Sequence, residues 1–149
     1  MTELVRPQAL QQLADAAVAV QANAYAPASH FAVGAAVLAD DGRVFAGCNV
    51  ENASYGLTIC AERAAVCAAV AAGARSLRAV AIATQLATPA RPCGACRQVL
   101  AEFGKDMVVV LVGSGGAQER TTLGALLPEP FTFADLARSR GAGGKPAGS

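Results

Sequence analysis

The sequence predicts one α/β domain, a three-layer α/β/α sandwich with a central mixed sheet of about five strands. An apolar content of 54% with a formal net charge of +1 excludes an intrinsically disordered chain. Segments with helical spacing of apolar residues alternate with short runs of apolar β-formers after an opening hairpin. The chain of 149 residues is long enough to bury one core. We expect residues 1–140 to form this domain and the Gly/Ala/Ser-rich residues 141–149 to be a disordered tail.

The expected elements follow one another along the chain, each from a local pattern. Leu10, Leu13 and Ala17 recur at the spacing of one helix face, and Asp41-Gly42 is typical of a hairpin turn. The N-terminal half is predicted to contain a helix over 7–23, strands over 31–39 and 44–50, and a helix over 59–72. The C-terminal half is predicted to contain a strand over 79–84, a loop over 87–92, a helix over 94–103, a strand over 107–112 and a helix over 133–138.

The composition narrows the classes of function. Twelve Lys and Arg are balanced by eleven Asp and Glu, so the chain has no excess of positive charge with which to bind a polyanion. The absence of Trp limits stacking on nucleic-acid bases. The longest apolar stretch is too short to cross a membrane, and the N-terminus lacks the pattern of a signal peptide. We therefore expect a cytoplasmic protein that binds neither nucleic acid nor membranes.

The five cysteines indicate a metal site. An odd number excludes a complete set of disulfides within the chain, and in a reducing compartment cysteine pairs are metal ligands or catalysts. Cys60 and Cys93 each stand at a predicted helix start, where the helix dipole favours the thiolate, and Cys96 completes a C-x-x-C motif. Three thiolates can bind one zinc ion and leave its fourth position to water. The C-x-x-C motif alone would also suit a redox dithiol or part of a structural zinc site.

Three other residues have side chains that could serve as a fourth ligand. Cys67 lies about 10 Å along the predicted helix from Cys60, too far to share its metal. Cys48 falls in an apolar strand, and we interpret both Cys48 and Cys67 as buried packing residues. His30 precedes a strand and is interpreted as a surface or capping residue. Three cysteines and one water are therefore the expected ligands.

Glu62 adds a proton-transfer group to this metal site. It follows Cys60 by two residues, which suits an acid/base beside an open zinc position, although helix glutamates are commonly only solvated. Cys-x-Glu with a distant Pro-Cys-x-x-Cys is the signature of zinc nucleobase deaminases. Beyond it, residues 25–136 resemble the small homotetrameric cytidine deaminases, through FAVGAA (31–36), GCNVENASY (47–55), ICAER (59–63) and LLPEPF (126–131).

The resemblance implies an activity and its metal centre. Cys60, Cys93 and Cys96 would bind one Zn²⁺ per subunit, and the enzyme would deaminate cytidine and 2′-deoxycytidine hydrolytically in pyrimidine salvage. Zinc would activate the water that attacks carbon 4, while Glu62 protonates ring nitrogen 3 and then the departing amine. Arg63 matches an arginine that hydrogen-bonds the ligand sulfurs and withdraws their charge; an exposed helix arginine is the alternative.

The resemblance also implies the substrate-binding residues, which are Phe31, Asn49, Glu51, Tyr55, Ala61 and Phe131. Asn49 and Glu51 would bind the ribose 3′-hydroxyl, although polar residues at a strand end can also cap a loop. Phe31 and Phe131 would pack on the base, with Phe131 coming from a neighbouring subunit of a homotetramer. Tyr55 lies where subunits of this family meet. The active sites would thus be shared between subunits.

Several alternatives remain open from the sequence. Blasticidin S deaminase shares the fold, the Cys-x-Glu motif and the assembly, but Asn49-Val50-Glu51 and the Leu-Leu-Pro-x-x-Phe segment favour a nucleoside. Phe133 competes with Phe131 for the role at the base. Polynucleotide deaminases usually have His where Cys60 stands and need a basic channel. A non-enzymatic zinc-stabilised domain would need four ligands and no Glu62.

Overall fold

A five-stranded mixed sheet forms the centre of the computed structural model, which describes residues 4–142. The strand order is β2-β1-β3-β4-β5. The strands are β1 (Gly34–Ala39), β2 (Val44–Cys48), β3 (Leu77–Ala83), β4 (Val108–Val112) and β5 (Gln118–Thr122). β3 and β4 pair in parallel, and every other neighbouring pair in this order is antiparallel. The predicted mixed sheet is confirmed.

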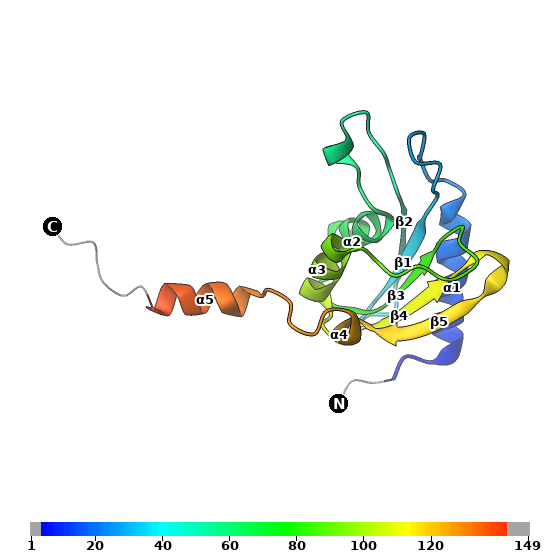
Figure 1. Cartoon of the computed structure of the whole chain (residues 1–149). Coiled ribbons are helices and arrows are strands. Elements are labelled where there is room, and N and C mark those ends of the chain that lie inside the picture. Colours follow the sequence, from blue (N-terminus) through cyan, green and yellow to red (C-terminus); the bar gives the residue numbers. More distant parts are fainter. Residues whose placement is uncertain (1–3, 143–149) are drawn as a thin grey trace.

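Helices cover both faces of this sheet (Figure 1). The helices are α1 (Pro7–Gln21), α2 (Ala61–Ala71), α3 (Gly94–Phe103), α4 (Leu123–Leu126) and α5 (Phe133–Ala142). α1 packs on one face, while α2 and α3 lie side by side on the other. The three-layer sandwich is therefore confirmed. Within the described residues, no helix combines the length and the apolar character needed to cross a membrane.

Each face of the sheet has its own core. Leu10 and Leu13 of α1 are buried against Ala36 and Leu38 of β1. On the other face the buried residues of α2, α3 and the strands include Ala65, Val66, Ala69, Val37, Val80, Ile82, Leu100, Val109 and Leu111. Every residue of β1 is buried, because this strand is central and has helices on both faces.

Helix α2 approaches strand β2 closely at Gly47. A Cβ atom on Gly47 would lie 2.4 Å from the backbone nitrogen of Ala65 and 2.9 Å from the carbonyl oxygen of Ala61. Both distances are shorter than van der Waals contact, so only glycine fits here. The backbone of the first two turns of α2 therefore rests directly on the backbone of β2.

The structure differs from the sequence prediction at several elements. β5, with the sequence QERTT, was not predicted, because it is an exposed polar edge strand that pairs with β4 through its backbone. β2 ends at Cys48, and residues 49–51 continue as a loop that forms isolated bridges at Val50. α5 continues to Ala142, past the predicted end at 138 and into the expected tail. The rest of that tail, 143–149, lies outside the described residues.

Three segments project from the body of the domain. Two are the loops that follow α1 and β2, over residues 22–33 and 49–60, which stand at the top of Figure 1. The third is the C-terminal arm, residues 127–142, which ends in α5; α5 itself stands away from the sheet and the other helices (Figure 1). The described side chains of α5 are all at least partly exposed. The arm therefore buries little surface against its own chain.

Candidate metal centre and cavity

Three cysteines converge where α2 and α3 begin. Cys60 is the N-cap of α2, Cys93 is the N-cap of α3, and Cys96 lies in the first turn of α3. Their Sγ atoms all lie within 4.8 Å of one another. Zinc–sulfur bonds of about 2.3 Å place two tetrahedral ligands about 3.8 Å apart, so these sulfurs fit one zinc ion. Soft thiolates at two helix N-termini also suit the charge and chemistry of zinc.

The electrostatics of the three sulfurs favour a bound cation. Burial, together with the charges of Glu62 and Cys60, raises the pKa of the Cys96 thiol. Burial also opposes ionisation of Cys93, but hydrogen bonds from the Cys96 backbone amide and side chain leave the pKa of Cys93 lowered. An energetic penalty from burial and neighbouring charge therefore opposes ionisation of Cys96 in this cluster. A divalent cation would offset it and keep all three sulfurs deprotonated.

The remaining potential ligands lie outside this group. Cys48, Cys67 and His30 do not belong to the metal-binding group found among the described residues. Cys67 is exposed and Cys48 is half-buried, so the interpretation of both as buried packing residues is wrong. In α2, whose sequence is almost uniformly apolar, the buried face holds Ala65, Val66 and Ala69, and Cys67 faces away from it. The sequence alone could not show which face is buried.

Arg63 contacts the metal cluster from α2. Its Nη2 donates to the Sγ of Cys60 at 3.4 Å and to the carbonyl oxygen of Thr58 at 3.2 Å. The hydrogen bond to Cys60 raises the pKa of Arg63 despite the opposing effect of burial. The predicted contact between Arg63 and a ligand sulfur is thus present. A guanidinium at this position withdraws charge from the thiolate.

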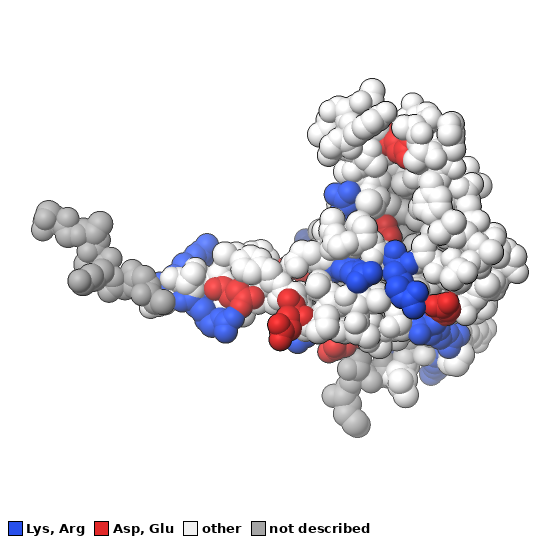
Figure 2. Space-filling model, in the orientation of Figure 1, with Lys and Arg blue, Asp and Glu red and all other residues white. Residues whose placement is uncertain are grey.

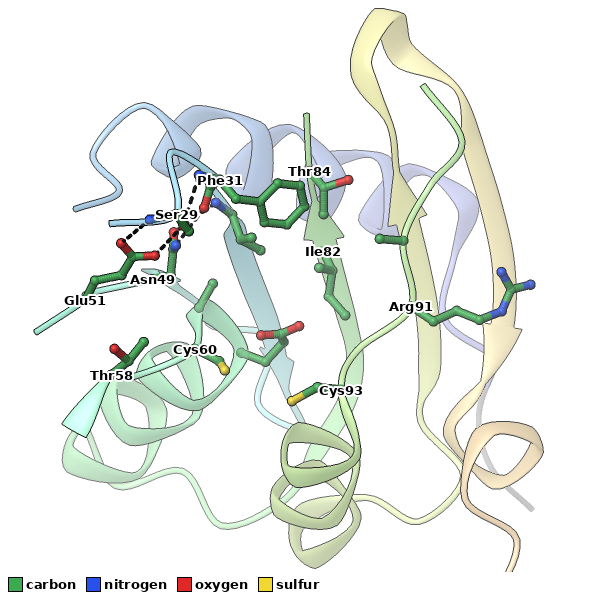
Figure 3. A pocket seen from close by; sticks show the side chains of 14 residues that line it. Ser29, Phe31, Asn49, Glu51, Thr58, Cys60, Ile82, Thr84, Arg91 and Cys93 are labelled. Carbon is green, nitrogen blue, oxygen red and sulfur yellow. Dashed lines mark hydrogen bonds between the residues drawn. The ribbon is translucent and has the colours of Figure 1, made fainter. Parts of the chain in front are cut away.

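A cavity of about 270 Å³ opens beside the sulfurs (Figure 3). Its lining residues are Ser29, Phe31, Val33, Asn49, Glu51, Thr58, Cys60, Ala61, Glu62, Ile82, Thr84, Ala90, Arg91 and Cys93. They come from the two projecting loops, from the start of α2, from β3 and from the segment before α3. Figure 2 shows the molecule hollowed between these loops, with basic and acidic side chains interspersed below the hollow.

The cavity brings together most of the predicted site residues. Phe31, Asn49, Glu51, Ala61 and Glu62 all line it, beside two of the three cysteines. The predicted Tyr55 and Phe131 do not line it, and their side chains are exposed. Within one chain the aromatic residue of the cavity lining is therefore Phe31, and Phe131 lies outside that lining.

Glu62 is buried at the floor of the cavity. Its side chain is 6% exposed, although it lies in the first turn of a helix. The Sγ of Cys96 lies 3.5 Å from its Oε2. Because Glu is seldom buried without a partner, its burial beside the sulfurs marks Glu62 as a candidate functional residue. From this position it can exchange protons with a molecule bound beside the sulfurs.

Asn49 fixes the loop that carries Phe31. Its Nδ2 donates to the carbonyl oxygen of Phe31 at 2.8 Å, and its Oδ1 accepts from the backbone N–H of Val33 at 2.9 Å. The side chain is almost fully buried and still lines the cavity. An amide group has two N–H donors and two acceptor lone pairs, so one of each stays available for a ligand.

Glu51 is held by the other end of the same loop. Its Oε1 accepts from the backbone N–H groups of Ala28 (2.9 Å) and Ser29 (3.0 Å), and its Oε2 accepts from the Ser29 hydroxyl. These bonds, the Ser29 hydroxyl first among them, lower the pKa of Glu51. Ser29 Oγ also accepts from the N–H of Phe31 at 3.0 Å. His30 lies between Ser29 and Phe31 and has a φ of 55°. This bend in the chain lets the Ser29 hydroxyl bond to both Glu51 and the Phe31 N–H.

Replacing Ser29 should lower the stability of the protein at neutral pH and weaken the dependence of that stability on pH in acid. A carboxylate with a lowered folded-state pKa stabilises the fold above its unfolded pKa, and this is lost as pH falls through the folded value. Ser29→Ala removes the largest cause of the shift, so the variant should be less stable above the unfolded pKa, and its loss on acidification should be smaller and complete at a higher pH. Thermal unfolding followed from pH 7 to pH 3 measures this, with the exposed Ser54→Ala as control. Identical Tm profiles for Ser29→Ala and wild type would contradict the role of the hydroxyl.

Several residues that line the cavity were not predicted from the sequence. They are Ser29, Thr58, Thr84 and Arg91. Ser29 had a detectable signal, because it lies two residues before the predicted Phe31 in a Pro-containing turn. Thr84 and Arg91 had none, because their position depends on how β3 and the loop before α3 meet.

The fold and the cavity together define a class of protein. A buried glutamate beside three convergent thiols, at the starts of two helices on a mixed sheet, is the arrangement of the zinc-dependent nucleobase deaminases. Residues 7–112 match the family model described as the cytidine and deoxycytidylate deaminase zinc-binding region. The chain belongs to the cytidine deaminase family. The predicted zinc is thus supported by both the family and the three-sulfur group.

Individual relatives agree with this membership. The chain is 50% identical over 115 residues to the cytidine deaminase of Sporosarcina psychrophila, covering 76% of this chain and 85% of that protein. It is 50% identical over 119 residues to the cytidine deaminase of Mycobacterium tuberculosis, covering 80% and 86%. The crystal structure of cytidine deaminase from Burkholderia pseudomallei superposes with a TM-score of 0.78 at 51% identity, covering 81% of this chain and 98% of that one.

Proposed function

We propose that this protein hydrolyses cytidine and 2′-deoxycytidine to uridine and 2′-deoxyuridine and releases ammonia. The observation that carries the proposal is Glu62, a buried carboxyl group 3.5 Å from one of three convergent sulfurs, at the floor of a cavity. Cys60, Cys93 and Cys96 would hold one zinc ion per subunit. A redox dithiol would need neither the third sulfur nor a buried glutamate beside it.

Glu62 would move protons in both halves of the reaction. When bound, zinc supplies Lewis-acid activation of a water molecule. Glu62 would accept a proton from the attacking water and deliver it to ring nitrogen 3 as carbon 4 becomes tetrahedral. It would then carry the second proton to the exocyclic amine, which leaves as ammonia when the C–N bond breaks. Water and cytidine thus give uridine and ammonia, and the carboxylate is regenerated.

The other cavity residues would orient the nucleoside. Ala61 is the first residue of α2, and its N–H belongs to the helix start that has no intrahelical acceptor, so it can donate to the base carbonyl. Asn49 and Glu51 would bind the ribose 3′-hydroxyl with the hydrogen-bonding capacity that the loop leaves unused. Phe31 would pack on the base.

The charges around the cavity favour a nucleoside over a nucleotide. Among the described lining residues the only basic side chain is Arg91, and its Nη2 lies 3.3 Å from the Glu119 carboxylate. In Figure 3 the guanidinium of Arg91 points away from the cavity. The two acidic side chains in the lining, Glu51 and Glu62, would repel a phosphate. An uncharged substrate fits this balance.

The projecting surfaces support a homotetramer with shared active sites. Tyr55 is 77% exposed, Phe131 is 61% exposed and Phe133 is 70% exposed, and exposed aromatic residues of this kind mark interaction surfaces. We place Phe131 of one subunit at the base-binding cavity of a neighbour. Free cysteines close together are typical of a reducing compartment, which supports a cytoplasmic location.

Turnover of cytidine by the zinc-loaded protein tests the proposed function. We expect one ammonia and one uridine per cytidine consumed. The fall in ultraviolet absorbance as cytidine is consumed measures the rate, and quantification of uridine and ammonia measures the stoichiometry. Sedimentation at low micromolar concentration should show a tetramer. The zinc-loaded protein failing to convert either nucleoside would overturn the proposal, and an active monomer would contradict the shared site.

Free cytosine should be a very poor substrate. A site that hydrogen-bonds a sugar hydroxyl leaves Asn49 and Glu51 without that partner when the sugar is absent, and such losses reach about 10⁴-fold in specificity. Comparing kcat/KM for cytidine and cytosine measures the effect. Equal values for the two compounds would show that these residues do not bind the sugar.

Arg63→Gln should retain zinc and lose activity. Without the guanidinium, the three thiolates keep their full negative charge and make zinc a weaker Lewis acid, so we expect kcat to fall about 10- to 100-fold. Zinc content by atomic absorption and kcat for cytidine are the measurements, with Arg75→Gln as a control on an exposed arginine of the same region. Full activity with unchanged zinc affinity in Arg63→Gln would rule out the tuning role.

A further inference from the structure

Two consecutive residues of α3 hold the C-terminal arm. Arg97 donates through Nη1 to the carbonyl oxygen of Leu126 at 3.0 Å, and Gln98 donates through Nε2 to the carbonyl oxygen of Phe131 at 2.8 Å. Arg97 also donates through Nε to the carbonyl oxygen of Pro92 at 2.8 Å, the residue before Cys93. Helix α3, which begins at the candidate metal ligands Cys93 and Cys96, therefore also holds both ends of residues 126–131, where the arm begins.

The segment between these two contacts is stiff. Pro128 and Pro130 restrict their own φ angles and those of the residues before them to extended conformations. Directly after Phe131, Thr132 and Asp135 form a reciprocal cap at the start of α5, with the Thr132 N–H donating to Asp135 at 2.8 Å. Phe131 thus stands between an anchor on α3 and a capped helix start. Its backbone is fixed although its side chain touches little of its own chain.

We propose that Gln98 is a positioning residue for base binding in the neighbouring subunit, because it orders Phe131 in advance. This rests on the proposed function, in which Phe131 packs on the base bound by a neighbour. Without the Gln98 contact, the arm remains attached through α4 but the Phe131 backbone regains its freedom. Substrate binding must then order it, which for one residue weakens binding roughly five- to thirty-fold.

Gln98→Met, which keeps the length of the side chain and removes its N–H donors, tests the proposal. We expect KM for cytidine and the Kd for uridine, measured by calorimetry, to rise roughly five- to thirty-fold, with kcat within about threefold of wild type. Zinc content and sedimentation should match wild type. Gln98→Lys restores a donor and should recover most of the affinity, whereas Gln98→Glu should not. The exposed Gln8→Met, on α1, is the matched control.

A second comparison separates this proposal from the proposed function. In the Phe131→Ala background, Gln98→Met should weaken uridine binding no further, because the side chain it positions is gone. An undiminished effect in that background, an unchanged uridine Kd in Gln98→Met, or loss of zinc or tetramer in that variant would overturn the positioning role of Gln98. If Phe131→Ala itself binds uridine normally, the assignment of Phe131 in the proposed function fails instead, and the role of Gln98 falls with it.

Discussion

Glu62→Gln is expected to lower kcat for cytidine by about 10²–10⁴-fold while zinc stays bound. The amide keeps the size and the hydrogen-bonding shape of the carboxyl group at this buried position, but it cannot accept the proton of the attacking water. The other carboxyl group in the cavity lining, Glu51, is hydrogen-bonded to Ala28 and Ser29, so we expect that it does not replace Glu62. Steady-state turnover, zinc content and the Kd for uridine together measure the effect.

A matched control tests whether this effect is specific to Glu62. Glu102 lies on the exposed side of α3, and Glu102→Gln should leave kcat and zinc content unchanged. A kcat for Glu62→Gln within about a factor of three of wild type would show that the buried carboxyl group does not transfer protons in the reaction. Loss of zinc in Glu62→Gln would instead indicate a role for Glu62 in building the metal site.

Cys96→Ala should abolish both zinc binding and activity. Cys96 is fully buried, and its removal leaves two thiols at the starts of two different helices. Two thiolates do not complete the site, so we expect dialysed Cys96→Ala to contain almost no zinc. Its Tm should also stop responding to added zinc, whereas a ligand present at 1,000 times its Kd stabilises the native protein by about 4 kcal/mol.

Cys67→Ala is the matched control for the metal ligands. Cys67 is exposed on α2 and lies outside the three-sulfur group, so zinc content, Tm and kcat should be those of wild type. Retention of about one zinc per subunit at wild-type affinity in Cys96→Ala would contradict the assignment of Cys96. Loss of zinc in Cys67→Ala would mean that the ligand set is different from the one described.

Apolar patterns made most of the fold predictable from the sequence. The apolar runs of β1, β3 and β4 and the helical spacing in α1 each indicate their own element, because burial requires those patterns. β5 could not be found in this way, because its residues are polar and mostly exposed, and it is held in the sheet by backbone pairing with β4. The end of α5 was also missed, because Ser139 to Gly141 are exposed and carry no apolar pattern.

The candidate site was predictable where chemistry restricts the residue type. Cys60, Cys93, Cys96 and Glu62 stand out because thiolate donors and a carboxyl group at that spacing have few other uses. The hydrogen bonds of Ser29 to Glu51 were not predictable, because they depend on the left-handed backbone at His30. Gln98 was missed for a related reason: its partner is the carbonyl oxygen of Phe131, which any residue could provide.

The contact at Gly47 has a consequence for engineering this enzyme. The start of α2 contains Cys60, Ala61 and Glu62. The distance of that helix from the sheet depends on Gly47 of β2, which has no side chain. A single methyl group on an element that contributes no side chain to the cavity would lift the whole start of the helix. Variants selected for new substrates should therefore change the loop residues around Phe31 freely, while position 47 tolerates no replacement.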